Sequence, residues 1–321
     1  MKTRKTEKKR LMENNDTAAE NLSFTVPEEL AGCRLDKGIS EYYEDLSRSR
    51  MSRLIKDGGV LVNGKAEKAS FILSEQDEIE FSLPVPGLPD ILPEDIPVEV
   101  LYDDPAILIV NKPKGMVVHP ASGHYSGTLV NALMYHCRDL SGINGVLRPG
   151  IVHRIDKDTS GSLIVCKNDA SHKSVAQQLK EHSIDRLYRA VVWGRFRDSE
   201  GTVDLPIGRD RKDRKKMGVD PSGKRAVTHY RVLGEAGEFS YIECRLETGR
   251  THQIRVHMAN IGHPVFGDEV YGARRSKIKT SGQTLHAYFI GLISPATGEK
   301  VEVYAPLPEY FISILEKTGL K

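Results

Sequence analysis

The feature that most constrains this chain is a proline-rich segment that separates a short N-terminal part from a long C-terminal part. The segment runs from Ser82 to Pro97 and reads SLPVPGLPDILPEDIP. Proline fixes the backbone φ angle and lacks an N–H donor, so this composition favours an extended linker over a helix or a strand. The sequence therefore predicts two folding units joined by a linker over residues 83–97.

The two predicted units differ greatly in size. Residues 98–321 are enough to bury a sizeable core, whereas a unit over residues 23–82 is marginal on its own. Residues 1–22 are polar and rich in Lys and Arg, and are predicted to form a disordered basic tail. The chain as a whole has a net charge of only +2, so contact with a polyanion must rest on local basic patches.

Composition also bears on where the protein works. No stretch approaches the roughly 18 uncharged apolar residues of a membrane span, and no apolar segment follows the basic N-terminus MKTRKTEKKR. The four cysteines are far apart and form no CxxC pair, which indicates neither a metal site nor a disulfide framework. These features predict a cytoplasmic protein without a membrane partner.

The N-terminal unit is predicted to contain two short helices followed by a small sheet. Apolar residues recur at helical spacing from Leu35 to Leu46, and Ser49 is a suitable N-cap for a second helix that ends at Gly58. The pair Asn63-Gly64 is typical of a hairpin turn, and a further strand ends near Phe81.

In the C-terminal part, strands adjoin strands as often as helices. Strands are predicted at residues 107–111 and 162–166, and within LYRAVVWGRF and YIECRLET. This order favours an α+β fold over regular βαβ winding.

Two helices of this part have clear start signals. Asn168 is a suitable N-cap for one, with Val175, Ala176 and Leu179 on its inner face. Thr251 is expected to cap the other, which would bury Ile254, Met258 and Ile261 and end at Gly262.

The most informative segment is RPGIVHRIDKDTSGSLIVC, in which a polar turn joins two strands. Asp156 and Asp158 are both candidates for a carboxylate at the rim of a cleft, and Arg154 and Lys157 lie beside them to keep a carboxylate ionised. The same residue types are also typical of an ordinary turn.

A second cluster, LETGRTHQIRVHM, places Arg250, His252, Arg255 and His257 around the start of a helix. Arg255 should lie on the flank of the buried stripe, where a guanidinium can hold a carboxylate or bind phosphate. The two histidines are five residues apart and do not share a helical face, so structural histidines are favoured over a metal site.

Basic runs occur elsewhere, in RDRKDRKKM (209–217) and GARRSKIK. One such run is usually a solvated loop, but several together indicate a partner with a phosphate backbone. Tyr188 lies in a strand between Arg186 and Arg189, where an inward aromatic ring is usually part of the core.

Taken together, these blocks resemble a known family. HRIDKDTSG (153–161) closely resembles the catalytic motif of the RluA/RluD family of RNA pseudouridine synthases. VNKPKGMVVHP, TLVNALMYH, RLYRAVVWG, LETGRTHQIRVHM and HPVFGD resemble further family blocks in the family order, and cover most of residues 98–308. RLDKGISEYYEDLSRSRMSRLIKDGGVLVNGK is similar to an RNA-binding domain of the ribosomal protein S-four type, which points to the RluD-like branch.

The resemblance implies a fold and a set of catalytic residues. The fold is an α+β catalytic domain with a mixed, largely antiparallel sheet and a central cleft, preceded by a small α/β RNA-binding domain. Asp156 matches the family's catalytic aspartate, and Tyr188 matches the tyrosine that packs on the target base and is a candidate for moving a proton. Arg255 is expected to pair with the aspartate, in preference to Arg250. Arg154 is expected to fill the space left by a flipped nucleotide.

The resemblance also implies the partner and the reaction. RNA is the expected partner, with contacts from Arg154, Arg250, Arg34, Arg48, Arg50, Arg53, Lys56 and Lys112. The isomerisation of uridine involves no redox change, so neither a cofactor nor a metal is implied. The expected substrate is large-subunit (23S) ribosomal RNA; the alternatives are tRNA, a non-catalytic ribosome-assembly factor, and an N-glycosidase that would release free uracil.

Overall fold

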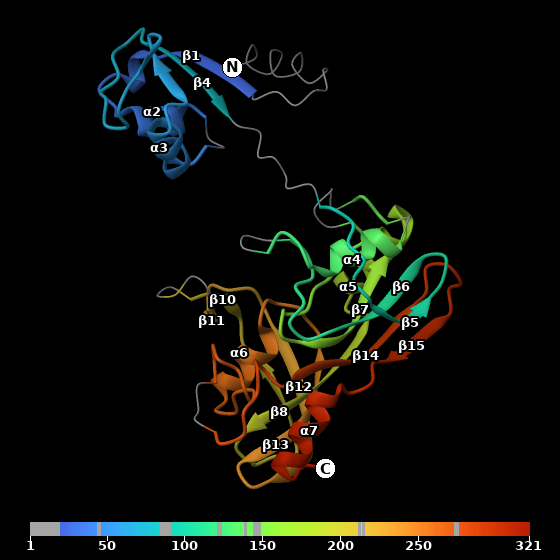
Figure 1. Cartoon of the computed structure of the whole chain (residues 1–321). Helices are drawn as coiled ribbons and strands as arrows, with labels where there is room; N and C mark the ends of the chain where they lie inside the picture. Colours follow the sequence, from blue (N-terminus) through green and yellow to red (C-terminus); the bar gives the residue numbers. More distant parts are fainter. Residues whose placement is uncertain are drawn as a thin grey trace. The chain divides into compact units, whose positions relative to one another are not determined.

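The computed structural model describes residues 20–43, 46–83, 91–120, 124–137, 140–143, 149–210, 213, 216–272 and 276–321. The chain forms two compact units that divide between Leu88 and Pro89, and each is described by itself (Figure 1). Within the described ranges, no helix is both long and apolar enough to cross a membrane.

The smaller unit packs two helices against a four-stranded sheet with the strand order β1-β4-β2-β3. Its elements are β1 (Glu20–Thr25), the 3-10 helix η1 (Glu28–Leu30), α2 (Leu35–Tyr42), α3 (Arg48–Lys56), β2 (Val60–Val62), β3 (Lys65–Ala66) and β4 (Glu78–Leu83). Both helices bury one apolar side, which includes Leu35, Ile39, Met51 and Ile55, against side chains of the sheet. The expected two helices and small sheet are therefore confirmed.

Several boundaries of this unit differ from those predicted. The strand β1 begins at Glu20 because it pairs with β4 along its whole length, so the last residues of the predicted tail belong to the sheet. The helix α2 ends at Tyr42, before Leu46, and α3 begins at Arg48, so Ser49 lies inside the first turn and is not its N-cap. The predicted hairpin turn is confirmed, since Asn63 and Gly64 have φ angles of 50° and 74°.

The larger unit is built on a mixed nine-stranded sheet with the order β5-β6-β7-β14-β8-β13-β12-β9, and β15 pairs with β14. Its strands are β5 (Glu99–Asp103), β6 (Ile107–Lys112), β7 (Ser160–Cys166), β8 (Asp185–Trp193), β9 (Glu200–Asp204), β12 (Val227–Ala236), β13 (Phe239–Leu246), β14 (Leu285–Ile293) and β15 (Lys300–Tyr304). A separate hairpin consists of β10 (Ile207–Arg209) and β11 (Met217–Val219), and the helices are α4 (Leu129–His136), α5 (Asp169–Lys180), α6 (Gln253–Asn260) and α7 (Glu309–Thr318).

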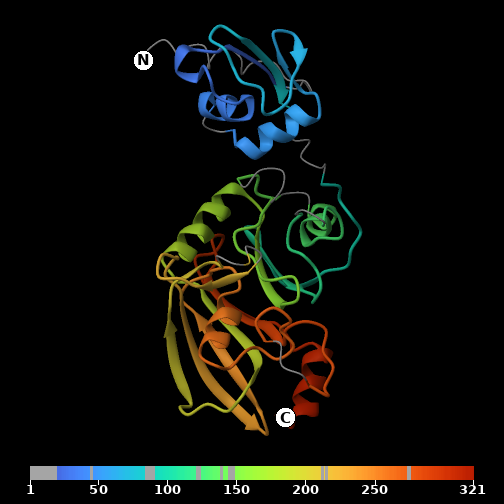
Figure 2. The same cartoon turned by 90° about the vertical axis from the view of Figure 1, so that its left-hand side faces the viewer.

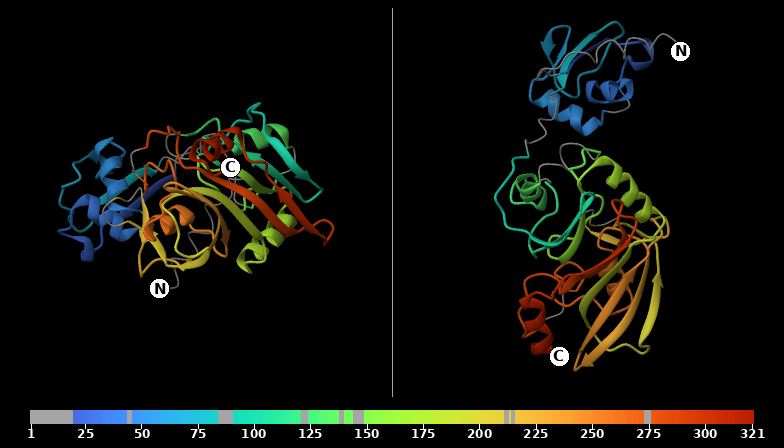
Figure 3. Two further views of the ribbon diagram at one scale, coloured as in Figure 1. Left: turned by 90° about the horizontal axis from the view of Figure 1, so that it is seen from below. Right: turned by 90° about the vertical axis from the view of Figure 1, so that its right-hand side faces the viewer.

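The central strands read as unbroken apolar runs because both faces of the sheet are covered. Along β6, Leu108 and Val110 belong to the core beneath α4 and α6, whereas Ile107 and Ile109 belong to the core beneath α5. The helix α7 packs on the β8 region through a further cluster that includes Phe311. Figures 2 and 3 show the long strands of this unit lying side by side.

Of the named strand pairs, β7 and β14 run parallel and the others run antiparallel, which confirms the expected mixed, largely antiparallel sheet. The parallel pair matches His286 with Ser160 and Ala287 with Gly161. At Gly161 the φ angle is 113°, and a Cβ atom would lie 2.2 Å from the carbonyl oxygen of Ala287. Only glycine fits this position.

Part of the segment expected to be an extended linker is packed against the larger unit. Ile91 is buried in the core that also holds Leu133. The Asn131 side chain donates to the carbonyl oxygen of Leu92 at 2.8 Å, and the Glu94 N–H donates to the carbonyl oxygen of Asn131 at 3.0 Å. These contacts give residues 91–97 a fixed path without a helix or a strand.

The helix α5 begins as the sequence indicates. Asn168 caps it with a reciprocal capping box, in which its side chain accepts from the Ser171 N–H at 2.8 Å. Its buried side is shifted from the predicted one: Val175 is buried, but Ala176 is exposed.

Candidate active site

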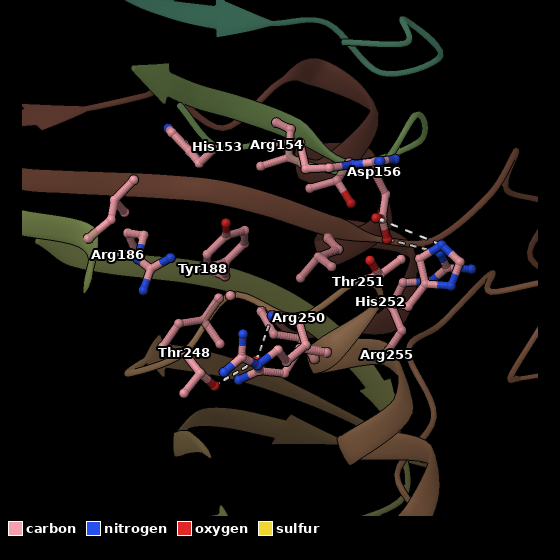
Figure 4. Close-up of a pocket in the computed structure, with 18 of the residues that line it drawn as sticks. His153, Arg154, Asp156, Arg186, Tyr188, Thr248, Arg250, Thr251, His252 and Arg255 are labelled. Carbon is pink, nitrogen blue, oxygen red and sulfur yellow. Dashed lines mark hydrogen bonds and ion pairs between the residues drawn. The ribbon is translucent and has the colours of Figure 1, made fainter. Parts of the chain in front are cut away.

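Asp156 lies in the wall of a cavity of about 540 Å³ in the larger unit (Figure 4). An isolated bridge pairs Ile151 with Val165 beside β7, and His153 accepts a hydrogen bond from the Ile164 N–H at 2.9 Å. These contacts fix the chain before the turn. The carbonyl oxygen of Asp156 then accepts from the Thr159 N–H at 3.1 Å, which closes the turn just before β7 begins.

The structure brings Asp156 and Arg255 together from positions about a hundred residues apart in the chain. Nη1 of Arg255 donates to Oδ2 of Asp156 at 2.9 Å. The side chain of Asp156 is 17% exposed and that of Arg255 is 7% exposed. This charged pair therefore stands at the cavity surface with one carboxylate oxygen, Oδ1, free of the guanidinium.

Arg255 is itself held by a second carboxylate. Its Nε and Nη2 donate to Oδ2 and Oδ1 of Asp268 at 2.6 and 3.0 Å, which is the planar bidentate geometry that favours arginine over lysine. Asp268 also accepts from the backbone N–H groups of Val270 and Tyr271. Burial is the largest single effect and tends to raise the pKa of Asp268, but the hydrogen bonds and charge of Arg255, together with the two backbone N–H bonds, outweigh it and the pKa is lowered.

His252 lies beside the same carboxylate in a strained backbone conformation. Its φ angle of 57° is left-handed, and its Nε2 is 3.9 Å from Oδ1 of Asp156. Nδ1 of His252 lies 2.8 Å from the hydroxyl of Tyr271, which accepts from the Met217 N–H. Burial lowers the pKa of His252 against the opposing charge of Asp156.

The start of α6 corrects the prediction that Thr251 is its N-cap. The N-cap is His252, whose side chain makes no capping bond. The Gln253 side chain instead accepts from the Arg250 N–H at 2.9 Å and from the Thr248 hydroxyl at 2.8 Å. Ile261 is only half-buried, and Gly262 follows it with a φ angle of 89°, as predicted for the end of the helix.

Tyr188 lines the cavity from β8 and is 8% exposed. Burial raises the pKa of its hydroxyl to about 12. Its ring belongs to the core on the α6 side of the sheet, so the residue is both a core aromatic and part of the cavity wall. The neutral hydroxyl group is a hydrogen-bond donor at ordinary pH.

The other two arginines of the motifs line the cavity, and within the described residues neither forms a hydrogen bond or ion pair with Asp156. Arg154 lines the cavity and is exposed to solvent. Arg250 also lines it, but its Nε donates to the carbonyl oxygen of Arg225 at 2.9 Å. Asp158, the second candidate carboxylate of the turn, is absent from the cavity lining within the described residues.

The expectation that Lys112 contacts RNA is wrong. Its side chain is fully buried, and Nζ donates to the carbonyl oxygens of Pro113, Met116 and Lys157 at 2.8, 2.8 and 3.0 Å. These bonds use all three ammonium donors. Lys112 therefore ties together the backbone around the Asp156 turn.

His257 has a structural environment. Its Nδ1 lies 2.9 Å from the Thr228 hydroxyl and its Nε2 lies 2.9 Å from the carbonyl oxygen of Leu205. Among the residues that the structure describes, no group of three or more His, Cys, Asp or Glu could hold a metal ion.

In the smaller unit, four of the predicted RNA-binding residues are exposed. Arg34 and Arg48 both bond to Asp36, whose side chain is 5% exposed, at 3.0 Å through their Nε atoms. Arg53 and Lys56 lie on the exposed side of α3. Arg50 also belongs to α3, but its side chain lies outside what the structure describes.

Three residues of the site were not predicted from the sequence. Asp268, the last residue of the block HPVFGD, supports Arg255, and Tyr271, three residues further on, supports His252. Arg186 lines the cavity from β8 and is 7% exposed. Its position two residues before Tyr188, on the same face of a strand, was the one available signal.

Comparison with known proteins identifies the family. A family model described as RNA pseudouridylate synthase matches residues 106–260, and one described as S4 domain matches residues 33–79. The chain is 51% identical over 295 residues to an uncharacterized RNA pseudouridine synthase, YlyB, of Bacillus subtilis, covering 92% of this chain and 97% of that protein. It is 47% identical over 301 residues to ribosomal large subunit pseudouridine synthase D of Zymomonas mobilis, covering 89% of this chain and 93% of that protein.

A solved structure agrees. Human RNA pseudouridylate synthase domain containing 1 superimposes with a TM-score of 0.55 and 28% identity, over 70% of this chain and 86% of that one. The cavity that holds Asp156, Tyr188 and Arg255 lies mostly within the span of the synthase model. The chain belongs to the RluA/RluD family of RNA pseudouridine synthases and is an isomerase that acts on RNA and carries an S4 RNA-binding domain before its catalytic domain.

Proposed function

We propose that this enzyme isomerises specific uridines of large-subunit (23S) ribosomal RNA, with Asp156 as its catalytic aspartate. The observation that carries the proposal is the shared guanidinium of Arg255, which holds Asp156 at the cavity wall while Asp268 holds Arg255 from behind. A carboxylate oriented in this way at a cavity wall can act on the ribose or the base as the glycosidic bond breaks.

Reaching the carboxylate requires the target uridine to leave its stack, at a cost of a few kcal/mol. Tyr188 offers an aromatic face inside the cavity on which the extruded base can pack. Arg154, which is exposed beside Asp156, is placed to fill the space that the nucleotide leaves or to bind a neighbouring phosphate.

The reaction then needs only positioning and proton movement. The uracil ring detaches at N1, turns, and rejoins the ribose through C5; a proton is lost from C5 and one is gained at N1. Tyr188 is the proposed carrier of a proton, because its side chain lines the same cavity as Asp156.

The choice of ribosomal RNA is supported by relatives and by the S4 domain. Several relatives at 42–47% identity are named ribosomal large subunit pseudouridine synthase D. In the smaller unit, Arg34, Arg48, Arg53 and Lys56 supply exposed positive charge suited to a phosphate backbone. We therefore assign these four residues to RNA binding, and tRNA is the second candidate substrate.

The test is a pseudouridine map by carbodiimide labelling and primer extension. Unmodified transcripts of large-subunit ribosomal RNA and of tRNA are incubated with the full-length enzyme. New stops in the ribosomal transcript alone are expected. Stops only in tRNA would overturn the ribosomal assignment, and release of free uracil would overturn isomerisation in favour of hydrolysis.

A further inference from the structure

Arg186 is a buried cation inside the catalytic cavity that the mechanism above does not use. It is 7% exposed, lines the cavity, and lies on the same face of β8 as Tyr188. Figure 4 shows its guanidinium on the far side of Tyr188 from Asp156. Both Arg186 and Asp156 act electrostatically on the Tyr188 hydroxyl, which agrees with a ring that lies between them.

The hydrogen bonds of Arg186 are incomplete. Its Nη2 donates to the carbonyl oxygen of Glu247 at 3.1 Å, but its Nε is buried and finds no acceptor in the described part of the chain. It forms no ion pair with any described carboxylate, in contrast to Arg255, which bonds to two. A buried donor on a charged group without an acceptor is unfavourable, so the free protein holds this group ready for a ligand.

A glycine lies next to the Arg186 guanidinium. A Cβ atom on Gly249 would lie 2.9 Å from Nη1 of Arg186. A larger residue at this position would displace the guanidinium from where it lies at the cavity wall.

The geometry of a bound uridine indicates which atom meets Arg186. With the ribose at Asp156 and the base packed on Tyr188, the edge of uracil opposite N1 points away from Asp156. That edge carries the C4 carbonyl oxygen, O4. The RNA backbone, by contrast, must leave through the mouth of the cavity, where Arg154 is exposed.

We propose that Arg186 donates a hydrogen bond to O4 of the target uracil and thereby selects uridine over cytidine. Cytosine carries an amino group at C4, which is a donor and would leave the buried guanidinium without an acceptor. The proposal rests on the proposed function, because that function sets the direction in which the base lies.

The test replaces O4 alone. Three synthetic RNA stem-loops carry uridine, 4-thiouridine or 2-thiouridine at the position found by mapping, and single-turnover rates are measured with full-length enzyme. Sulfur is a weak acceptor, so wild-type enzyme should convert the 4-thiouridine RNA at least about tenfold more slowly than the uridine RNA. The 2-thiouridine RNA, changed at the other carbonyl, should follow uridine more closely.

The variant Arg186→Met should slow the uridine RNA to the rate of the 4-thiouridine RNA, so that the preference disappears. Arg186→Lys keeps a buried cation and should retain part of the preference for uridine over 4-thiouridine RNA. This variant provides the test if Arg186→Met does not fold. The matched control is Arg245→Met, which removes an exposed arginine that faces Leu187 across the β13–β8 pair and should keep the wild-type preference.

The outcomes separate the two proposals. A wild-type preference that persists in Arg186→Met would overturn the assignment of O4 as the ligand of Arg186. Wild-type enzyme that converts uridine and 4-thiouridine RNA equally would also overturn it, while leaving the catalytic proposal intact. The mapping experiment tests the proposed function separately: no new stop in the ribosomal transcript would overturn that function before the thiouridine comparison is made.

Discussion

Arg255 donates hydrogen bonds to two carboxylates at once, and this sharing determines how much stability the protein should lose when Arg255 is replaced. Asp268, whose side chain is fully buried, receives two of its bonds, and Asp156 receives the third. The inner pair is buried and bidentate, unlike the exposed ion pairs of the surface, which contribute little. The pair therefore belongs to the fold as much as to the site.

Replacing the shared guanidinium should destabilise the protein strongly. Arg255→Met leaves Asp268 buried without its cation, which costs about 3–5 kcal/mol. Arg154→Met, at an exposed position in the same site, should change the free energy of unfolding by less than about 0.5 kcal/mol. Urea denaturation measures both; equal effects would contradict the structural role of the inner pair.

The same pair predicts a dependence on pH. The pKa of Asp268 is lowered in the folded protein, where Arg255 holds it against the effect of burial. A lowered pKa contributes stability that is fully present above the unfolded pKa, about 4, and is lost as pH falls through the folded value. Relative to Asp268→Asn, the wild-type protein should lose stability below about pH 4. An unchanged difference in unfolding free energy between pH 6 and pH 3 would contradict this.

At the scale of elements, the parallel contact of β7 and β14 joins the two halves of the sheet. Gly161 allows this contact because its missing side chain leaves room for the Ala287 carbonyl group. The Asp156 turn leads directly into β7, so a distortion here reaches the site.

Gly161→Ala should therefore cost at least about 3 kcal/mol, from left-handed strain and a backbone clash together. The control is Gly298→Ala, at a φ angle of 73° with no atom within 4 Å of the added Cβ, where strain alone should cost about 1–2 kcal/mol. Thermal and urea unfolding give the comparison. Equal losses would show that the strand contact does not need the glycine.

The helices and strands also show which features of the fold could be predicted from the sequence. Periodicity and caps predicted α2, α3, α5 and α6 and the central strands, because those signals are local. Cap details failed at His252, which is the N-cap without a side-chain capping bond, while the Gln253 side chain accepts from the Arg250 N–H ahead of the helix.

Contacts between distant segments could not be predicted in this way. Neither the bidentate Asp268–Arg255 pair nor the burial of Lys112 has a local signal, since both depend on how loops meet in space. One long-range contact of the site was nevertheless predicted. The position of Arg255 on the flank of α6 indicated that it could hold a carboxylate, and its Nη1 donates to Asp156.

At the scale of the whole molecule, two units divide the work that we propose: the larger holds the reacting groups and the smaller supplies RNA contacts. Removing Arg53 and Lys56 by double alanine substitution should weaken RNA binding across sequences. It should also lower the slope of log affinity against log salt by about 1–2, since each phosphate contact contributes about 0.7–0.9.

Lys65 and Lys68 provide the control, because both are exposed on the same unit but lie outside α3. Their double alanine variant should retain most of the wild-type salt slope. Filter binding with the ribosomal transcript at several salt concentrations measures both variants. A larger loss in the control would place the RNA contact on another part of the small unit.

The most direct test of the account is pseudouridine formation on the mapped ribosomal transcript by wild-type enzyme and Asp156→Asn, with RNA affinity measured alongside. Asparagine keeps the size of the side chain but removes the carboxylate charge, while Arg255 remains held by Asp268. The account predicts that Asp156→Asn forms no product above background and still binds RNA with nearly wild-type affinity. Product formation by Asp156→Asn at a rate close to wild type would contradict it.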